Sequence, residues 1–252
     1  MSRYDFRTPR LYVPDALSET ARLALNASQA NYLGNVLRLA TGAPVLVFNG
    51  HDGEWRATLE SAGKRRLFLV LAERVRAQTA ASDIHYLFAP LKHARLDYMV
   101  QKAVEMGAAR LQPVLTAHAQ VSRINLERMQ ANAIEAAEQC GILTLPEIAS
   151  PVDLNRTLAE RDSRRLLVFC DEAAETKDPV AALAPHRLAA GPTPVDVLVG
   201  PEGGFADHER TALLAVPNSV RLALGPRILR ADTAAVAALA LVGAVLGDRR
   251  PA

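Results

Sequence analysis

The sequence predicts a small β-rich domain followed by an α/β domain built on a mostly parallel sheet, and three observations predict it. From Ile84 onward, apolar runs of strand length alternate with segments whose apolar residues recur at helical spacing, which is typical of a parallel sheet covered by helices on both faces. Before Ile84, short alternating strands surround Asn49-Gly50 and Asp52-Gly53, which favour hairpin turns. Near the C-terminus, two glycine-bearing loops each follow an apolar run and precede a helix, where open α/β folds bind ligands.

The first domain, residues 1–76, is expected to form a small barrel with one helix. Strands are predicted at residues 45–48, 54–59 and 67–75. The helix is predicted over residues 29–38, with Ser28 as its N-cap. The short, small and polar segment 77–83 is expected to be a linker.

The second domain, residues 84–252, alternates strands with helices. The expected elements are a strand at 84–89, a helix at 92–106 stopped by Gly107, a strand at 111–115, a helix capped by Asn125 and ended by Gly141, a strand at 166–170, a helix opened by Asp178 and Pro179, and strands at 195–199 and 220–224. The last helix, residues 233–247, is almost uniformly apolar but shorter than the roughly 20 residues of a membrane span. We therefore expect it to be buried in the core and to pack against a second subunit.

Composition and charge narrow the class of protein. Cys140 and Cys170 are the only cysteines and lack the spacing of metal ligands, and no segment resembles a signal peptide, so a cytoplasmic protein without metal or membrane contact is expected. Residues 1–76 hold 11 Lys and Arg against 7 Asp and Glu, whereas the remainder holds 18 against 20. A basic first domain fits a phosphate-rich partner such as RNA. Ordinary charge scatter on a solvated surface is the alternative.

The first of the two loops follows the strand at 195–199. Gly200, Gly203 and Gly204 allow positive φ and close backbone approach to a ligand, and Asp207 is expected to cap the next helix. The spacing matches neither the dinucleotide-binding nor the P-loop pattern, so a nucleoside held mainly by backbone is favoured. A plain strand-to-helix turn is the alternative.

The second loop, residues 225–231, carries two arginines and ends at the apolar helix. Asp232 lies at this junction, where an acidic residue commonly serves as the helix N-cap. A catalytic role is equally open to it, and the two roles are compatible.

The two loops together resemble those of a known family. Gly-Pro-Glu-Gly-Gly at 200–204, followed by Leu-Gly-Pro-Arg-Ile-Leu-Arg-Ala-Asp-Thr-Ala at 224–234, is similar to the SPOUT-class RNA methyltransferases and, within them, to the RsmE family, which methylates N3 of a uridine in 16S ribosomal RNA. Segments that resemble the family pattern in the expected order also lie at 10–13, 32–39, 48–55, 92–107 and 135–141. The family has arginine where this chain has Ile142, and glutamate where it has Asp232.

The resemblance implies a fold and a function. The fold would be a PUA-like RNA-binding β-barrel domain followed by a SPOUT domain with a deep trefoil knot formed by its last strands and helices, one of the few exceptions to unknotted topology. The protein would use S-adenosyl-L-methionine, act on 16S rRNA or the small ribosomal subunit in the cytoplasm, and form a homodimer. A SPOUT methyltransferase with another RNA target, and an RNA-binding protein that has lost the chemistry, remain alternatives.

The resemblance also implies site residues. Asp232 is the candidate base for the N3 proton, and Arg230 the candidate for holding RNA or the anionic uracil, unless Arg230 merely pairs with its acidic neighbour. Glu202 either faces the sulfonium of the cofactor or anchors its loop. The expected RNA contacts are Arg7, Arg10 and Arg38. The expected cofactor contacts are Phe169, Cys170, Asp171, Glu172, Val199, Gly200, Pro201, Glu202, Gly203, Gly204, Leu222, Leu224, Gly225, Ile228 and Leu229.

Overall fold

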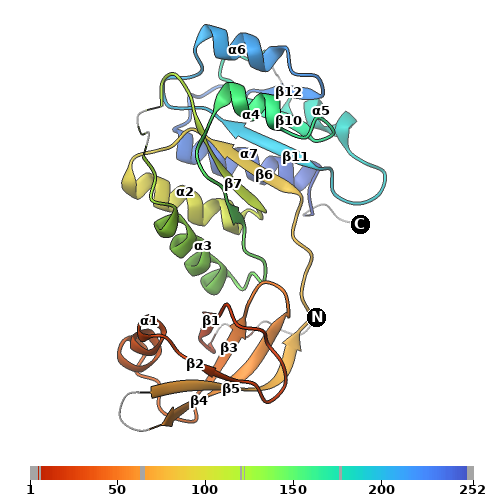
Figure 1. The fold of residues 1–252 in the computed structure, drawn as a ribbon. Helices are drawn as coiled ribbons and strands as arrows, with labels where there is room; N and C mark the ends of the chain where they lie inside the picture. Colours follow the sequence, from red (N-terminus) through yellow and green to blue (C-terminus); the bar gives the residue numbers. More distant parts are fainter. Residues whose placement is uncertain are drawn as a thin grey trace. The chain divides into compact units, whose positions relative to one another are not determined.

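The chain divides into two compact units. The computed structural model describes residues 5, 7–62, 66–119, 121, 123–175 and 178–248. One unit consists of residues 1–80 with 137–145, and the other of residues 81–136 with 146–252 (Figure 1). The division between residues 80 and 81 falls inside the linker expected at 77–83, whereas nothing in the sequence indicated that residues 137–145 belong with the first unit.

The first unit is built on one five-stranded sheet with the strand order β1-β3-β4-β5-β2. Its described elements are β1 (Arg10–Tyr12), β2 (Arg22–Ala24), the helix α1 (Ala27–Asn31), the π-helical turn η1 (Tyr32–Val36), β3 (Pro44–Phe48), β4 (Glu54–Ala62) and β5 (Arg66–Arg76). β1 pairs with β3 in parallel, and the other pairs are antiparallel. Apolar side chains from these strands form a core of their own, chiefly leucine and valine.

Local interactions determine the turn between β3 and β4 and the first residue of α1. The β3–β4 connection requires glycine at Gly53, because φ is +84° there and a Cβ would lie 2.3 Å from the carbonyl oxygen of Arg76. The helix begins earlier than predicted and has a different N-cap. Asn26, not Ser28, caps it: the Asn26 side chain accepts from the Gln29 N–H at 2.9 Å, and the Gln29 side chain accepts from the Asn26 N–H in return.

The second unit is built on a sheet with the order β12-β10-β11-β6-β7-β8, and β9 also pairs with β7. Its described elements are β6 (Ile84–Phe88), α2 (His93–Glu105), β7 (Arg110–Leu115), α3 (Leu126–Cys140, whose end belongs to the first unit), β8 (Glu147–Ile148), β9 (Val152–Asp153), α4 (Leu154–Glu160), β10 (Leu166–Cys170), α5 (Pro179–Leu183), the 3-10 turn η2 (Ala184–His186), β11 (Val195–Val199), α6 (Asp207–Leu214), β12 (Ser219–Leu222) and α7 (Ala231–Val245).

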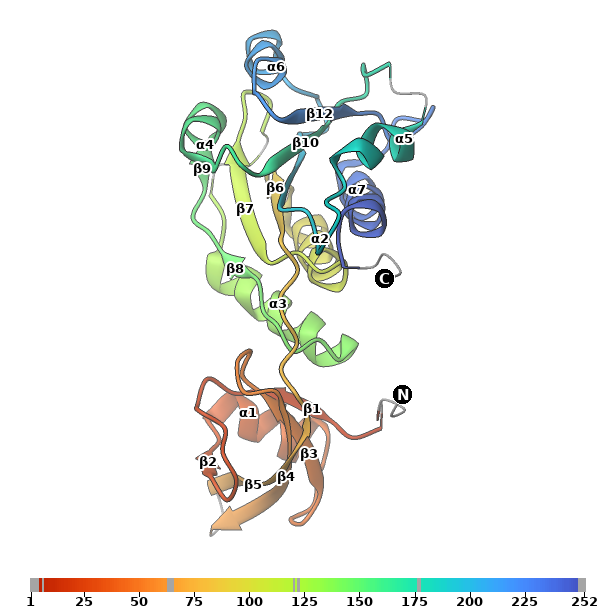
Figure 2. The same cartoon turned by 90° about the vertical axis from the view of Figure 1, so that its right-hand side faces the viewer.

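Every strand pair of this sheet is parallel, as the alternating pattern predicted. α4 packs against α6, whereas α2 and α5 pack against α7, which lies on β11. Figure 2 shows α4 on one side of the sheet and α5 and α7 on the other. The helices therefore cover both faces, and the loops at the carboxyl ends of the strands stay accessible.

Two helix starts differ from the prediction. Asp207 is the first residue of α6 rather than its cap; the carboxylate of Glu209 instead accepts from the N–H groups of Ala206 at 2.9 Å and Ala117 at 2.8 Å. Leu214, at the end of the same helix, is 53% exposed. Arg230 occupies the N-cap position of α7, so Asp232 lies inside the first turn of the helix and is not its cap.

α7 is also less completely buried than predicted. One side is buried, including Ala235, Leu239 and Val242, while Val236, Leu241 and their neighbours stay partly exposed. No helix in the described parts of the chain is long and apolar enough to cross a membrane.

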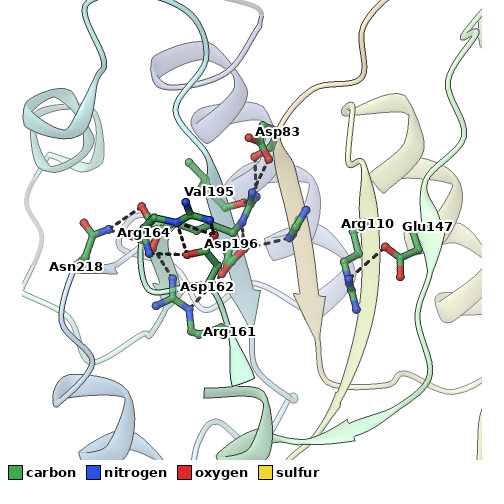
Figure 3. Close-up of polar contacts among 11 residues, drawn as sticks. Asp83, Arg110, Glu147, Arg161, Asp162, Arg164, Val195, Asp196 and Asn218 are labelled. Atoms are coloured by element: carbon green, nitrogen blue, oxygen red, sulfur yellow. Dashed lines mark hydrogen bonds and ion pairs between the residues drawn. The ribbon is translucent and has the colours of Figure 1, made fainter. Parts of the chain in front are cut away.

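The amino ends of three central strands are joined by a buried ion-pair network around Asp196 on β11. Its carboxylate accepts from Arg161 at 3.2 Å and from Arg165 at 2.6 Å, and it lies 3.3 Å from Nδ1 of His85. Arg165 also donates to the Asp83 and Val195 carbonyls. Figure 3 shows these contacts beside a separate pair between β7 and β8. The network fixes the sheet edge opposite the glycine-bearing loops.

Candidate functional site

A cavity of about 300 Å³ lies at the carboxyl edge of the sheet, where β10, β11 and β12 end side by side. The loops that follow these three strands and the start of α7 form its walls. Its lining residues are Cys170, Asp171, Glu172, Val199, Gly200, Pro201, Glu202, Gly203, Gly204, Phe205, Leu222, Leu224, Gly225, Pro226, Arg227, Ile228, Leu229, Ala231 and Ala234. The two glycine-bearing loops singled out in the sequence therefore do form walls of one cavity.

The glycines of the walls have different structural roles. Of the three in the first loop, only Gly204 has positive φ, at +70°, and its N–H donates to the Pro201 carbonyl at 2.9 Å. Gly200 is required for packing, because a Cβ there would lie 2.9 Å from the Phe205 ring. Gly225 has φ +109° and no atom within 4 Å of the position a Cβ would take. The second loop thus presents bare main chain.

Phe169, expected to contact a cofactor, does not line the cavity. It is 1% exposed and belongs to the core cluster that contains Leu167 and Leu198. Successive strand residues point to opposite faces, so Phe169 is turned into the core while its neighbour Cys170 lines the cavity. Burial raises the pKa of the Cys170 thiol to about 12, which keeps the thiol neutral and unreactive at neutral pH.

Asp171 anchors the wall formed by the loop after β10. Its side chain is fully buried and accepts from Arg210 of α6 at 3.0 Å and from Arg221 of β12 at 2.9 Å. These bonds commit the carboxylate to neighbouring arginines, leaving its main chain as the part that faces a ligand. Glu172 is more exposed, and its Oε1 lies 3.5 Å from the Arg210 guanidinium.

The first glycine-bearing loop is tied to two other elements. Glu202 forms an ion pair with Arg95 of α2, and both side chains are partly exposed. Nδ1 of His118 lies 3.1 Å from the carbonyl oxygen of Gly204. A hydrogen bond between these two atoms requires the imidazole tautomer that carries its proton on Nδ1. The Arg95–Glu202 pair favours the anchoring role for Glu202.

The two candidate catalytic residues lie at the start of α7, beside the cavity but outside its lining. Asp232 falls between the lining residues Ala231 and Ala234 and accepts from the Thr233 N–H at 2.9 Å. The Asp232 side chain is partly exposed. Arg230 is exposed, and within the described part of the chain it makes no ion pair with Asp232.

The structure separates the three arginines expected to contact RNA. Arg7 and Arg38 are exposed. Arg10 is only 6% exposed: it pairs with Glu54 at 2.6 Å, lies over the Phe48 ring at 4.4 Å and donates to the Ile142 carbonyl at 3.1 Å. These contacts hold the Arg10 guanidinium inside the first unit, so its role as an RNA contact is less favoured than that of Arg7 and Arg38.

Five lining residues were missed by the sequence prediction. They are Phe205, Pro226, Arg227, Ala231 and Ala234. All five lie inside or next to the two motif segments, so the motif boundaries were a usable signal. Ala231 and Ala234 lie one helical turn apart at the start of α7 and face the cavity together.

Comparisons with known proteins agree with this architecture. A family model described as an RNA methyltransferase domain matches residues 78–243, and one described as an RNA methyltransferase PUA domain matches residues 25–72. The ribosomal RNA small subunit methyltransferase E of Rickettsia conorii is 29% identical, with 92% of this chain and 94% of the relative covered. Its namesake from Synechocystis is 31% identical, with 92% and 76% covered.

Two solved structures are similar over nearly their full lengths. A protein of Legionella pneumophila described as a methyltransferase, solved with bound S-adenosylmethionine, has a TM-score of 0.82 at 30% identity, with 96% of this chain and 99% of that chain covered. The ribosomal RNA small subunit methyltransferase E of Neisseria gonorrhoeae, bound to S-adenosylmethionine, has a TM-score of 0.82 at 26% identity, with 97% and 100% covered.

The fold and the cavity at its sheet edge define an RNA methyltransferase of the SPOUT class with an N-terminal PUA domain. Matches extend over both units of the chain and include relatives at about 30% identity. The chain belongs to the ribosomal RNA small subunit methyltransferase E family.

Proposed function

We propose that this protein transfers a methyl group from S-adenosyl-L-methionine to N3 of a specific uridine in 16S ribosomal RNA. The observation that carries this function is the cavity of about 300 Å³ walled by the loops after β10, β11 and β12, in a chain of this family. The RNA methyltransferase names of the relatives support an RNA substrate, and the methyl donor bound to the two similar structures supports the cofactor.

The residues of the cavity fit this cofactor. The open main chain at Gly225 and the apolar side chains of Leu222 and Leu224 suit an adenosine moiety held by backbone and by van der Waals contact. The carboxylates of Glu172 and Glu202 at the rim suit a positively charged ligand. When bound, S-adenosylmethionine supplies a methyl group carried on a positively charged sulfur.

The chain's own residues would manage the charge of the target base. Uridine N3 carries a proton that must leave before or during methyl transfer, and a carboxylate can accept it. Asp232 is the candidate acceptor, because it lies in the first turn of α7 between two lining residues. Arg230, exposed at the N-cap, can hold an RNA phosphate or steady the negative charge that develops on the uracil.

We also propose a homodimer that acts on small-subunit RNA in the cytoplasm. The partly exposed side of α7 is lined by Val236, Ala240, Leu241 and Val245, apolar residues that a second subunit would cover. The exposed arginines Arg7 and Arg38 of the basic first unit supply candidate contacts to the RNA backbone.

Nucleoside mass spectrometry of 16S RNA tests the function. A strain lacking the gene should lose 3-methyluridine from 16S RNA, and the wild-type gene should restore it. Unchanged 3-methyluridine together with loss of another methylated nucleoside would instead identify a different target. If calorimetry detected no binding of S-adenosylmethionine to the purified protein, with or without RNA, the protein would be an RNA-binding protein without the chemistry.

A further inference from the structure

A second cavity lies beside the one proposed for the methyl donor. It has a volume of about 340 Å³ and shares two wall residues, Pro201 and Glu202, with the first cavity. Its other lining residues are Pro90, Leu91, Lys92, Ala94 and Arg95, from the end of β6 to the first turn of α2. A volume in this range suits a small ligand or a single nucleotide.

The charges around this cavity favour an anion. Lys92 and Arg95 both line it, and the first turn of α2 contains no acidic residue. Lys92 is at the N-cap but provides no capping bond, and it makes no ion pair within the described part of the chain. Arg95 already pairs with the Glu202 carboxylate, whereas the charge of Lys92 at the positive end of the helix dipole costs roughly 0.3–1 kcal/mol unless an anion binds there.

The remaining surface of the cavity is apolar. Pro90, Leu91, Ala94 and Pro201 supply aliphatic side chains on which the face of a base can lie. The cavity therefore combines an apolar wall with a rim that carries two cations, Lys92 and Arg95, and one carboxylate, Glu202.

We propose that this cavity receives a nucleotide of the RNA substrate, with its base against Leu91 and Pro201 and its phosphate on Lys92 and Arg95. The inference rests on the proposed function, since the shared wall at Glu202 places the bound nucleotide next to the methyl donor. It adds a subsite within the second unit to the RNA contacts expected in the first.

The Arg95–Glu202 ion pair is suited to a change of partner. The two side chains are 41% and 36% exposed, and pairs of this kind contribute at most about 1 kcal/mol to stability. A phosphate, like a carboxylate, can accept two parallel hydrogen bonds from one guanidinium, so it can replace Glu202 as the partner of Arg95. Arrival of the phosphate would then release the Glu202 carboxylate toward the space between the two cavities.

Salt-dependent RNA binding by full-length variants tests the subsite. For Lys92→Ala and Arg95→Gln, the plot of log affinity for a single-stranded fragment of 16S RNA against log salt should be less steep by about 0.7 each. The double variant should bind about tenfold more weakly near 0.15 M salt. The KM for RNA should rise, and the affinity for S-adenosylmethionine should stay unchanged.

Arg156→Gln is the matched control, because Arg156 pairs with a single partly exposed carboxylate, Glu160, outside this cavity. Ala94→Phe, which narrows the cavity without changing charge, should lower RNA affinity while preserving the salt slope. Should an arginine variant fold poorly, as judged by its melting temperature, Ala94→Phe still decides the matter.

A salt slope equal to that of the wild type, a loss shared equally by Arg156→Gln, or full RNA affinity in Ala94→Phe would overturn the subsite. RNA binding is measured without methyl transfer, so failure of the subsite can be distinguished from failure of the proposed function. A wild-type protein that binds the RNA but leaves uridine N3 unmethylated would refute that function and leave the cavity test valid.

Discussion

Gly200 has no room for a side chain, because a Cβ would lie 2.9–3.2 Å from three atoms of the Phe205 ring, which is itself buried. Gly200→Ala should therefore destabilise the protein by roughly 1–3 kcal/mol, the usual cost of overpacking, and displace a wall of the methyl-donor cavity. Urea unfolding and calorimetry with S-adenosylmethionine measure the two effects. Wild-type values for both would mean that the ring moves aside freely.

Gly203 supplies the matched control at the residue scale. A Cβ there would lie 3.5 Å from the Cβ of His118, an ordinary van der Waals contact, and its φ is not positive. Gly203→Ala should leave stability within about 0.5 kcal/mol of wild type. The branched side chain of Gly203→Val needs more room and should reduce cofactor affinity. The sequence marked these glycines alike; only the neighbouring ring and imidazole separate them.

Asp232→Asn tests the candidate base. The amide keeps the size of the side chain but cannot accept the N3 proton, so affinity for S-adenosylmethionine should be retained while the methylation rate falls by a factor of about 10²–10⁴. Binding calorimetry and a methyl-transfer assay on 16S RNA provide the two measurements. Normal turnover in this variant would remove Asp232 from the chemistry.

At the scale of elements, the strand ends are held by the network around Asp196. Burial alone would raise the pKa of Asp196, but hydrogen bonds from His85 and Arg165 and the charges of Arg165 and Arg161 lower it. A carboxyl with a lowered folded-state pKa stabilises the fold above its unfolded pKa of about 3.9, and this stability is lost as the pH falls through the folded value.

Asp196→Asn should therefore cost roughly 3–5 kcal/mol near pH 7, since it leaves two buried arginines without their shared carboxylate. The difference from wild type should begin to shrink as the pH falls below about 4, where the carboxyl of the unfolded chain takes up a proton, and should be lost once the pH is below the lowered folded-state pKa. Denaturant unfolding across this pH range measures the effect. Arg156→Gln, in an exposed pair, should change stability by less than about 0.5 kcal/mol, and an equal loss in both variants would contradict the role of the network.

Sequence patterns predicted the positions of strands and helices better than the residues at which the helices begin. The strands at 166–170 and 195–199 coincide with β10 and β11, because mostly apolar runs, broken here only by Asp196, mark strands buried on both faces. The caps were less predictable: Asn26 and Ser28 are both good caps, and the choice depends on which side chain reaches Gln29. No feature of the sequence predicted the π-helical turn η1 that follows α1.

At the scale of the whole molecule, the proposed dimer depends on the apolar side of α7. Leu241→Glu would place a charge where a second subunit is expected, and an unpaired charge in a buried interface is costly. The variant should sediment as a monomer in analytical ultracentrifugation, while Arg156→Gln should keep the wild-type mass. A wild-type protein that is already monomeric at micromolar concentration would contradict the dimer.

The order of the two domains could be predicted from the change of pattern near residue 84, but the inclusion of residues 137–145 in the first unit could not. The contacts responsible join side chains far apart in sequence: Arg76 donates to the Gly141 carbonyl at 2.7 Å, and Glu138 accepts from the Tyr12 N–H at 2.8 Å. Local patterns carry no information on such pairs.

Arg10 is buried, whereas Arg7 and Arg38, which the sequence grouped with it as RNA contacts, are exposed. Arg10→Ala would remove the 2.6 Å partner of the Glu54 carboxylate, which is 1% exposed and also contacts Arg76 at 2.9 Å, and would remove a donor from the Ile142 carbonyl. It should cost roughly 3–5 kcal/mol of stability.

Arg7→Ala and Arg38→Ala should leave stability nearly unchanged, because both side chains are exposed. If these two bind phosphates, each variant should flatten the salt dependence of RNA binding by about 0.7. Thermal unfolding and RNA binding at several salt concentrations distinguish a structural arginine from an RNA-binding one. A stably folded Arg10→Ala protein with a less steep salt dependence would show that Arg10 contacts RNA.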